Sequence, residues 1–179
     1  MTRAIKFSVL FAGIAFLLAC QTPLTEKTYP AYTTAEAKTA YTAWGNALSS
    51  SMNVTGTGTS VSSTTTSTGG TATFKSTDGK VTVTLTYTGT SAASYTSMVY
   101  TINLNGFKDV SSGYTFSGTM TMTMSSSSSV KMVGDFDVSG TGPIQKMTFD
   151  ISASSTSATT YTGYFKINGK DVDLTTMSN

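Results

Sequence analysis

Residues 81–88 read Val-Thr-Val-Thr-Leu-Thr-Tyr-Thr, and this stretch decides the fold. Apolar side chains stand at every odd position, and threonine stands at every even one. Successive side chains of a β-strand point to opposite faces, so the alternation predicts a strand with one apolar face and one hydroxyl-rich face. An antiparallel sheet with one face on a core and the other in water gives this pattern.

The same alternation returns several times in the second half of the chain. Stretches of turn-forming residues separate the repeats, and no helical pattern interrupts them, which argues against a parallel sheet. We therefore predict a mainly β fold, an antiparallel meander of about seven to nine strands. The repeats lie near 98–104, 114–124, 132–138, 147–151 and 164–174.

The last two strands meet at Asn168-Gly169, a dipeptide that favours a two-residue type I′ hairpin. With that loop, Lys166 pairs with Asp171. A meander with one apolar face has to cover that face. We expect a curved sheet, a half-barrel or a barrel, with a helix packed on it.

One amphipathic helix is predicted, over residues 33–50. Thr33-x-x-Glu36 has the form of a capping box, which satisfies free backbone N–H groups in the first turn. Apolar residues then recur at helical spacing on one stripe. The stripe consists of Ala37, Ala40, Tyr41, Trp44 and Leu48.

Residues 51–70 are ambiguous in sequence. Met52 and Val54 alternate with polar residues, which allows a first strand, and the remainder is rich in Ser, Thr and Gly and is interpreted as a loop. We assign residues 51–179 to the β-region and residues 33–179 to one globular domain.

The N-terminus has the features of a secretory signal peptide over residues 1–19. Arg3 and Lys6 precede an apolar run, residues 7–19, that ends in small residues. This run is shorter than the roughly 20 apolar residues that a membrane-spanning helix needs.

The signal peptide ends at Leu17-Leu18-Ala19-Cys20, which contains the only cysteine of the chain. This motif resembles the lipobox of bacterial lipoproteins. The resemblance implies cleavage before Cys20, a diacylglycerol on its sulfur and room for a further acyl chain on the new amino group. Two or more acyl chains hold a protein stably on a membrane. Gln21 differs from the Asp of an inner-membrane retention signal, which favours the outer membrane in a cell that has one. Residues 20–32 then form the lipidated cysteine and a flexible tether.

The composition argues against most enzyme classes. The chain has no His, which removes His-based nucleophile pairs and metal sites. Without Arg3 and Lys6 the basic residues fall from 11 to 9 and equal the 9 acidic ones, so no charge excess favours nucleic acid. We predict no enzymatic activity, no metal and no cofactor beyond the acyl groups. The acidic pairs at 135 and 137 and at 171 and 173 leave a carboxylate-based hydrolase as a remote alternative.

Methionines and aromatic residues gather on the predicted inward face. Flexible thioether side chains fill irregular apolar volumes, including those of binding surfaces. We predict a structural or binding protein of the cell envelope, whose partner is an apolar small molecule or an envelope protein. The alternatives are an ordinary core and a cavity between sheet and helix that carries a lipid. The candidate apolar-ligand face consists of Trp44, Met98, Tyr100, Phe116, Met120, Met122, Met124, Met132 and Met147.

Overall fold

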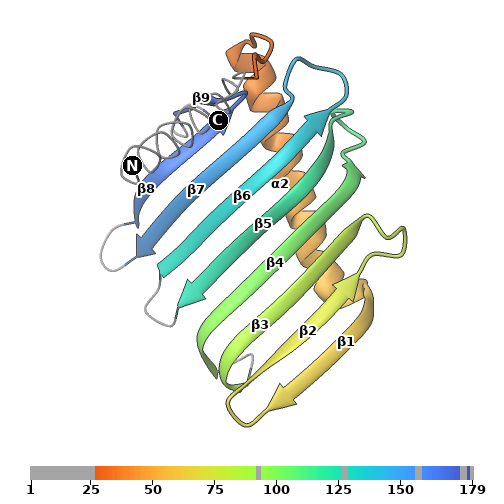
Figure 1. The fold of residues 1–179 in the computed structure, drawn as a ribbon, viewed down its shortest axis with the longest axis vertical. Helices are drawn as coiled ribbons and strands as arrows, with labels where there is room; N and C mark the ends of the chain where they lie inside the picture. The colour runs from red at the N-terminus through yellow and green to blue at the C-terminus, as the bar shows by residue number, and fades with distance from the viewer. Residues whose placement is uncertain (1–26, 92–93, 126–128, 156–158, 174–176, 178–179) are drawn as a thin grey trace, which may run out of the picture.

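The computed structural model describes residues 27–91, 94–125, 129–155, 159–173 and 177. Within these residues one long helix precedes nine strands, and each strand pairs antiparallel with the next one along the chain (Figure 1). The elements are α2 (Thr34–Thr57), β1 (Thr59–Thr66), β2 (Gly69–Lys75), β3 (Val81–Ser91), β4 (Ser94–Lys108), β5 (Thr115–Ser125), β6 (Ser129–Ser139), β7 (Lys146–Ser155), β8 (Thr159–Ile167) and β9 (Lys170–Asp171). The predicted fold class, a β-meander with one helix packed on it, is confirmed.

The sheet is open, with β1 at one end of the strand order and β9 at the other. The sheet is also uncurled, so of the shapes predicted from the sequence neither the barrel nor the half-barrel is adopted (Figure 1). Closure requires the first and last strands to pair along their length. β9 has two residues and β1 has eight, so β9 cannot serve as that partner.

α2 begins at the predicted capping box. The backbone N–H of Thr33 donates to the Glu36 carboxylate at 2.7 Å, and the backbone N–H of Glu36 donates to the Thr33 hydroxyl at 3.2 Å. These reciprocal bonds satisfy two N–H groups that a helix start leaves without partners.

The predicted end of the helix was wrong, because α2 continues to Thr57 instead of stopping at residue 50. Ser51 and Val54 extend the buried stripe, and the Ser51 hydroxyl donates to the carbonyl of Ala47 at 2.7 Å. Val54 fits both a helical and an alternating pattern, so the sequence around it did not decide between helix and strand.

The segment interpreted as a loop before residue 70 instead forms β1 and the start of β2. Thr66 pairs with Gly69 across a tight turn, and the ladder runs back to the pair of Thr59 with Lys75. Every residue of β1 is exposed, so no apolar alternation marks it as a strand. The hairpin is held by backbone bonds to β2.

The hairpin between β8 and β9 follows the prediction. Asn168 and Gly169 have φ angles of 50° and 78°, as a type I′ turn requires. Lys166 pairs with Asp171, and the N–H of Val172 donates to the carbonyl of Phe165 at 2.8 Å.

α2 crosses one face of the sheet at an angle to the strands (Figure 1). Its buried residues are mostly small, and the large side chains of the core come from the sheet. Small residues let the helix backbone lie close to the strands, so the phenylalanine rings fill the remaining space. The buried residues of α2 are Ala37, Ala40, Ala43, Trp44, Ala47, Ser51 and Val54, and the fully buried rings of the sheet are Phe116, Phe136, Phe149 and Phe165.

Candidate functional site

Rings pack tightly where α2 meets the sheet. The Trp44 ring lies 5.0 Å from the Phe149 ring and 6.1 Å from the Phe165 ring, centre to centre, and the rings of Phe149 and Phe165 stack at 5.7 Å. Trp44 is 7% exposed. The centre of the helix–sheet contact is therefore occupied by protein side chains.

The predicted ligand face divides into a buried part and a half-buried part. All of its strand residues lie on the face that carries the core, as the cross-strand register requires. The buried members are Trp44, Met98, Phe116, Met120 and Met147, and the half-buried members are Tyr100, Met122, Met124 and Met132.

Burial decreases along β3 away from the helix. In β3, Val81 and Val83 are 3% and 0% exposed, whereas Leu85 and Tyr87 are only half-buried. The register continues this half-buried region across the neighbouring strands, from Leu85 through Tyr100 to Met122. We call it the open strip. It consists of Leu85, Tyr87, Tyr100, Met122, Met124, Val130 and Met132. Met98, the register partner of both Tyr87 and Met124, is the buried exception in this region, at 5% exposed.

The open strip carries no formal charge. Its polar atoms include the phenol of Tyr100, whose pKa is raised above the ordinary value, first by burial and then by the nearby Tyr95. This phenol stays neutral around pH 7. The thioethers of Met122, Met124 and Met132 can adjust to an apolar surface of irregular shape.

A shallow hollow lies at the ends of β5 and β6 near residues 125 and 129, and most of its lining residues belong to the solvent-facing side of the sheet. Val130 and Ala153 contribute apolar atoms to it, and serine and threonine hydroxyl groups form much of the remaining lining. Lys131 also lines the hollow, and its ammonium group pairs with Asp150 at 3.3 Å. Only Val130 and Ala153 of this lining belong to the face that carries the open strip, so the hollow is mainly a hydroxyl-lined feature of the other face.

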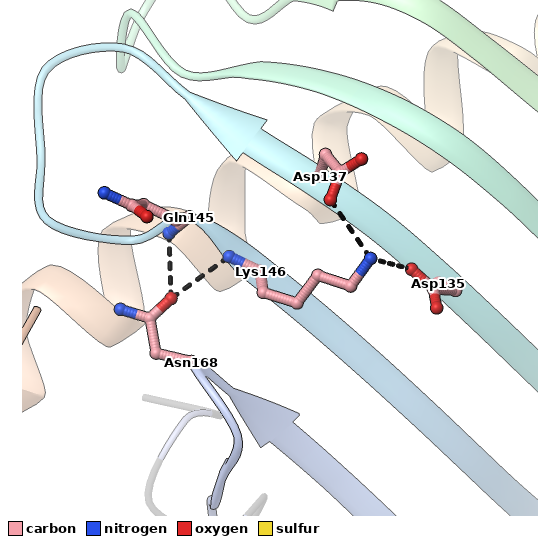
Figure 2. Close-up of polar contacts among 5 residues, drawn as sticks. All are labelled: Asp135, Asp137, Gln145, Lys146 and Asn168. Atoms are coloured by element: carbon pink, nitrogen blue, oxygen red, sulfur yellow. Dashed lines mark hydrogen bonds and ion pairs between the residues drawn. The ribbon is translucent and has the colours of Figure 1, made fainter. Parts of the chain in front are cut away.

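The acidic pairs lie on the opposite, solvent-facing side of the sheet. Lys146 forms ion pairs with both Asp135 and Asp137, at 3.1 Å to Asp137 (Figure 2). Burial lowers the pKa of Lys146, but the two carboxylates raise it more, so the net shift is upward. Lys166 pairs with Asp171 at 3.8 Å. The carboxylates of 135 and 137 thus share one lysine on an exposed surface, and neither lines the hollow described above.

Two polar residues whose side-chain contacts the sequence did not predict organise the loops. Asp109 follows β4 and accepts hydrogen bonds from the hydroxyls of Ser111 and Ser112 at 2.7 and 2.6 Å, and from the amide of Asn46 on α2 at 3.2 Å. Burial raises the pKa of Asp109, but these bonds outweigh it and hold the pKa below the ordinary value. Asp109 therefore fixes the loop after β4 to the helix.

Asn168 is the second such residue, and it is 5% exposed. Its amide oxygen accepts from the backbone N–H groups of Gln145 and Lys146 at 2.8 and 3.0 Å (Figure 2). Its amide nitrogen donates to the carbonyls of Pro30 and Pro143 at 3.1 and 3.0 Å. One side chain thus joins the N-terminal arm, the loop before β7 and the last hairpin. The Asn-Gly dipeptide predicted its turn but not these four bonds.

Neither a membrane-spanning helix nor a metal cluster is found in the described part of the chain. No helix there is long and apolar enough to cross a bilayer, and no group of three or more His, Cys, Asp or Glu residues there could hold a metal ion. The predicted signal peptide and Cys20 lie outside the described residues. Comparison of the chain with protein-family models, with curated proteins and with solved structures gives no match.

Proposed function

We propose that this protein is a lipid-anchored component of the bacterial cell envelope that acts by binding an apolar ligand or partner on the open strip, without catalysis. The observation that carries the binding role is the change of burial along the sheet. Apolar side chains are buried beneath α2, and beyond it most of them, with Met98 as the exception, are only half-buried. The anchoring role rests on the motif Leu17-Leu18-Ala19-Cys20.

The proposed lipid anchor predicts that removing the sulfur atom of Cys20 has a large effect. Replacing Cys20 with serine removes the thiol that would carry diacylglycerol, and the chain is expected to lose incorporation of radiolabelled palmitate. Gln21→Ser, next to it, should keep the label and stay with the membrane fraction. Equal labelling of Cys20→Ser and the unchanged protein would contradict the proposal.

The binding role predicts that the two faces of the sheet differ in their response to charge. Met132 and Val133 are neighbours on β6, with Met132 half-buried on the strip and Val133 42% exposed on the other face. We expect Met132→Glu to reduce labelling of the full chain by a photoreactive fatty acid at least about tenfold, because burying an unpaired carboxylate costs more than about 1.4 kcal/mol. Val133→Glu is the matched control and should leave labelling unchanged. The same loss in both variants, or no loss in Met132→Glu, would count against the strip.

The other two functions have less support. Carriage of a lipid between sheet and helix needs space where the rings of Trp44, Phe149 and Phe165 pack against one another. A carboxylate-based hydrolase needs a site around acids that here lie exposed and paired with Lys146.

A further inference from the structure

β1 forms one end of the sheet, and nothing in its sequence protects its outer edge. It pairs on one side with β2, and all eight of its residues are exposed. Its sequence, Thr-Ser-Val-Ser-Ser-Thr-Thr-Thr, has no charged residue and no proline. Natural sheets usually protect an edge strand with charges, proline, short length or a bulge, because an open edge invites another strand.

The two ends of the sheet differ in these respects. β9 has only two residues, Lys170 and Asp171, and both are charged and exposed. β1 has a register shift between Ser60 and Ser62, but the pairing from Ser62 to Thr66 is regular. This five-residue segment is therefore an uncharged edge ready to accept a strand.

Rows of hydroxyl groups cross the solvent-facing side of the sheet and end at β1. The Thr71 and Thr86 hydroxyls lie 3.2 Å apart across β2 and β3, and those of Thr73 and Thr84 lie 3.1 Å apart. Thr64 is the β1 partner of Thr71, and so continues that row to the edge. Cross-strand threonine pairs of this kind stabilise sheets.

We propose that β1 pairs antiparallel with β1 of a second copy of this chain, in the register that places Thr64 opposite Thr64 of the other copy. In this register Ser62 lies opposite Thr66, so the hydroxyl rows of one sheet continue into the other. A second copy fits because the strand carries no charge, and self-pairing therefore brings no like charges together in any register. The contact uses the same patch on both copies, which closes the assembly at two.

The proposed pairing has a geometric consequence. Two antiparallel edge strands within one continuous sheet are related by a two-fold axis perpendicular to the sheet. Both copies of α2, and both open strips, then lie on the same face of the joined sheet. The inference rests on the edge strand alone and does not depend on the proposed lipid anchor or ligand.

The first test places a cysteine at the proposed axis. Thr64→Cys in the full chain, oxidised in intact cells, is expected to give a disulfide-linked dimer on a non-reducing gel. Val133→Cys, exposed in the middle of the sheet, controls for random collision and for any reaction of Cys20. Dimer formation no greater than that of Val133→Cys, or cross-linking of Thr64→Cys mainly to a different protein, would overturn the proposal.

The second test exchanges charges at the two facing positions, with Thr64→Cys as the reporter. Chains with Ser62→Lys and Thr66→Lys place lysine opposite lysine twice, and chains with Ser62→Glu and Thr66→Glu do the same with glutamate. Each charged variant, expressed alone, is expected to give at least about fivefold less cross-linked dimer than Thr64→Cys without the added charges. Co-expression of the two, with tags of different size, should restore a mixed dimer, which also shows that both variants fold. Persistence of the lysine dimer, or failure of the mixture, would overturn the register and the proposal.

Discussion

Replacing Trp44 with alanine is expected to lower the free energy of unfolding by about 3–5 kcal/mol, the usual cost of truncating a large buried ring. Trp44 is the only tryptophan, and it is the helix side chain that reaches both Phe149 and Phe165. Its removal leaves a cavity between α2 and the sheet, and the small alanines on either side of it cannot fill that space.

Urea unfolding followed by far-ultraviolet circular dichroism measures this loss without relying on tryptophan fluorescence. Trp44→Phe keeps one ring in place and should lower the free energy of unfolding less than Trp44→Ala does. Val133→Ala, at an exposed position on the other face, should change stability by no more than about 0.5 kcal/mol. A loss below about 1 kcal/mol for Trp44→Ala would contradict the packing role.

Replacing Asn168 with alanine is expected to cost about 3–5 kcal/mol, because four hydrogen bonds of about 1 kcal/mol each are lost. The backbone adds to the loss, since φ at this residue is 50° and alanine tolerates that region poorly. The carbonyls of Pro30 and Pro143 and the N–H groups of Gln145 and Lys146 would all lose their partner.

Two further variants separate the turn from the side-chain bonds. Asn168→Gly accepts the left-handed backbone but loses all four side-chain hydrogen bonds. It should therefore regain only the smaller part of the stability that Asn168→Ala loses. Asn168→Asp keeps the two acceptor bonds but places a carboxylate against the carbonyls of Pro30 and Pro143. Thermal unfolding should rank the unchanged protein above all three variants. An Asn168→Gly protein as stable as the unchanged one would show that the turn alone matters.

The sequence was sufficient wherever local chemistry decides the structure. The alternation from Val81 to Tyr87 determined a strand and its faces, and the dipeptide at 168–169 determined a turn and a register. The capping pair of Thr33 and Glu36 located the start of the helix. In each case neighbouring residues carry the whole signal.

The sequence was insufficient to predict the structure where contacts between distant residues determine it. β1 has no apolar face, and backbone pairing with β2 forms it. The end of α2 depends on burial of Ser51 and Val54. The six methionines of the strands share one face, but which of them is covered depends on where α2 lies, and periodicity does not contain that information. The four bonds of Asn168 join segments up to 138 residues apart.

The order of the strands also determines when the chain can finish folding. Every chain emerges from synthesis or translocation with its N-terminal end first, and in this meander each new strand meets its partner at once. α2 emerges before the whole sheet, yet the rings that cover Trp44 belong to β7 and β8. The carbonyl of Pro30 can accept its hydrogen bond from Asn168 only after that residue has been made. The first element of the described chain is therefore among the last to be buried, and the nascent chain exposes the apolar stripe of α2 until its final hairpin arrives.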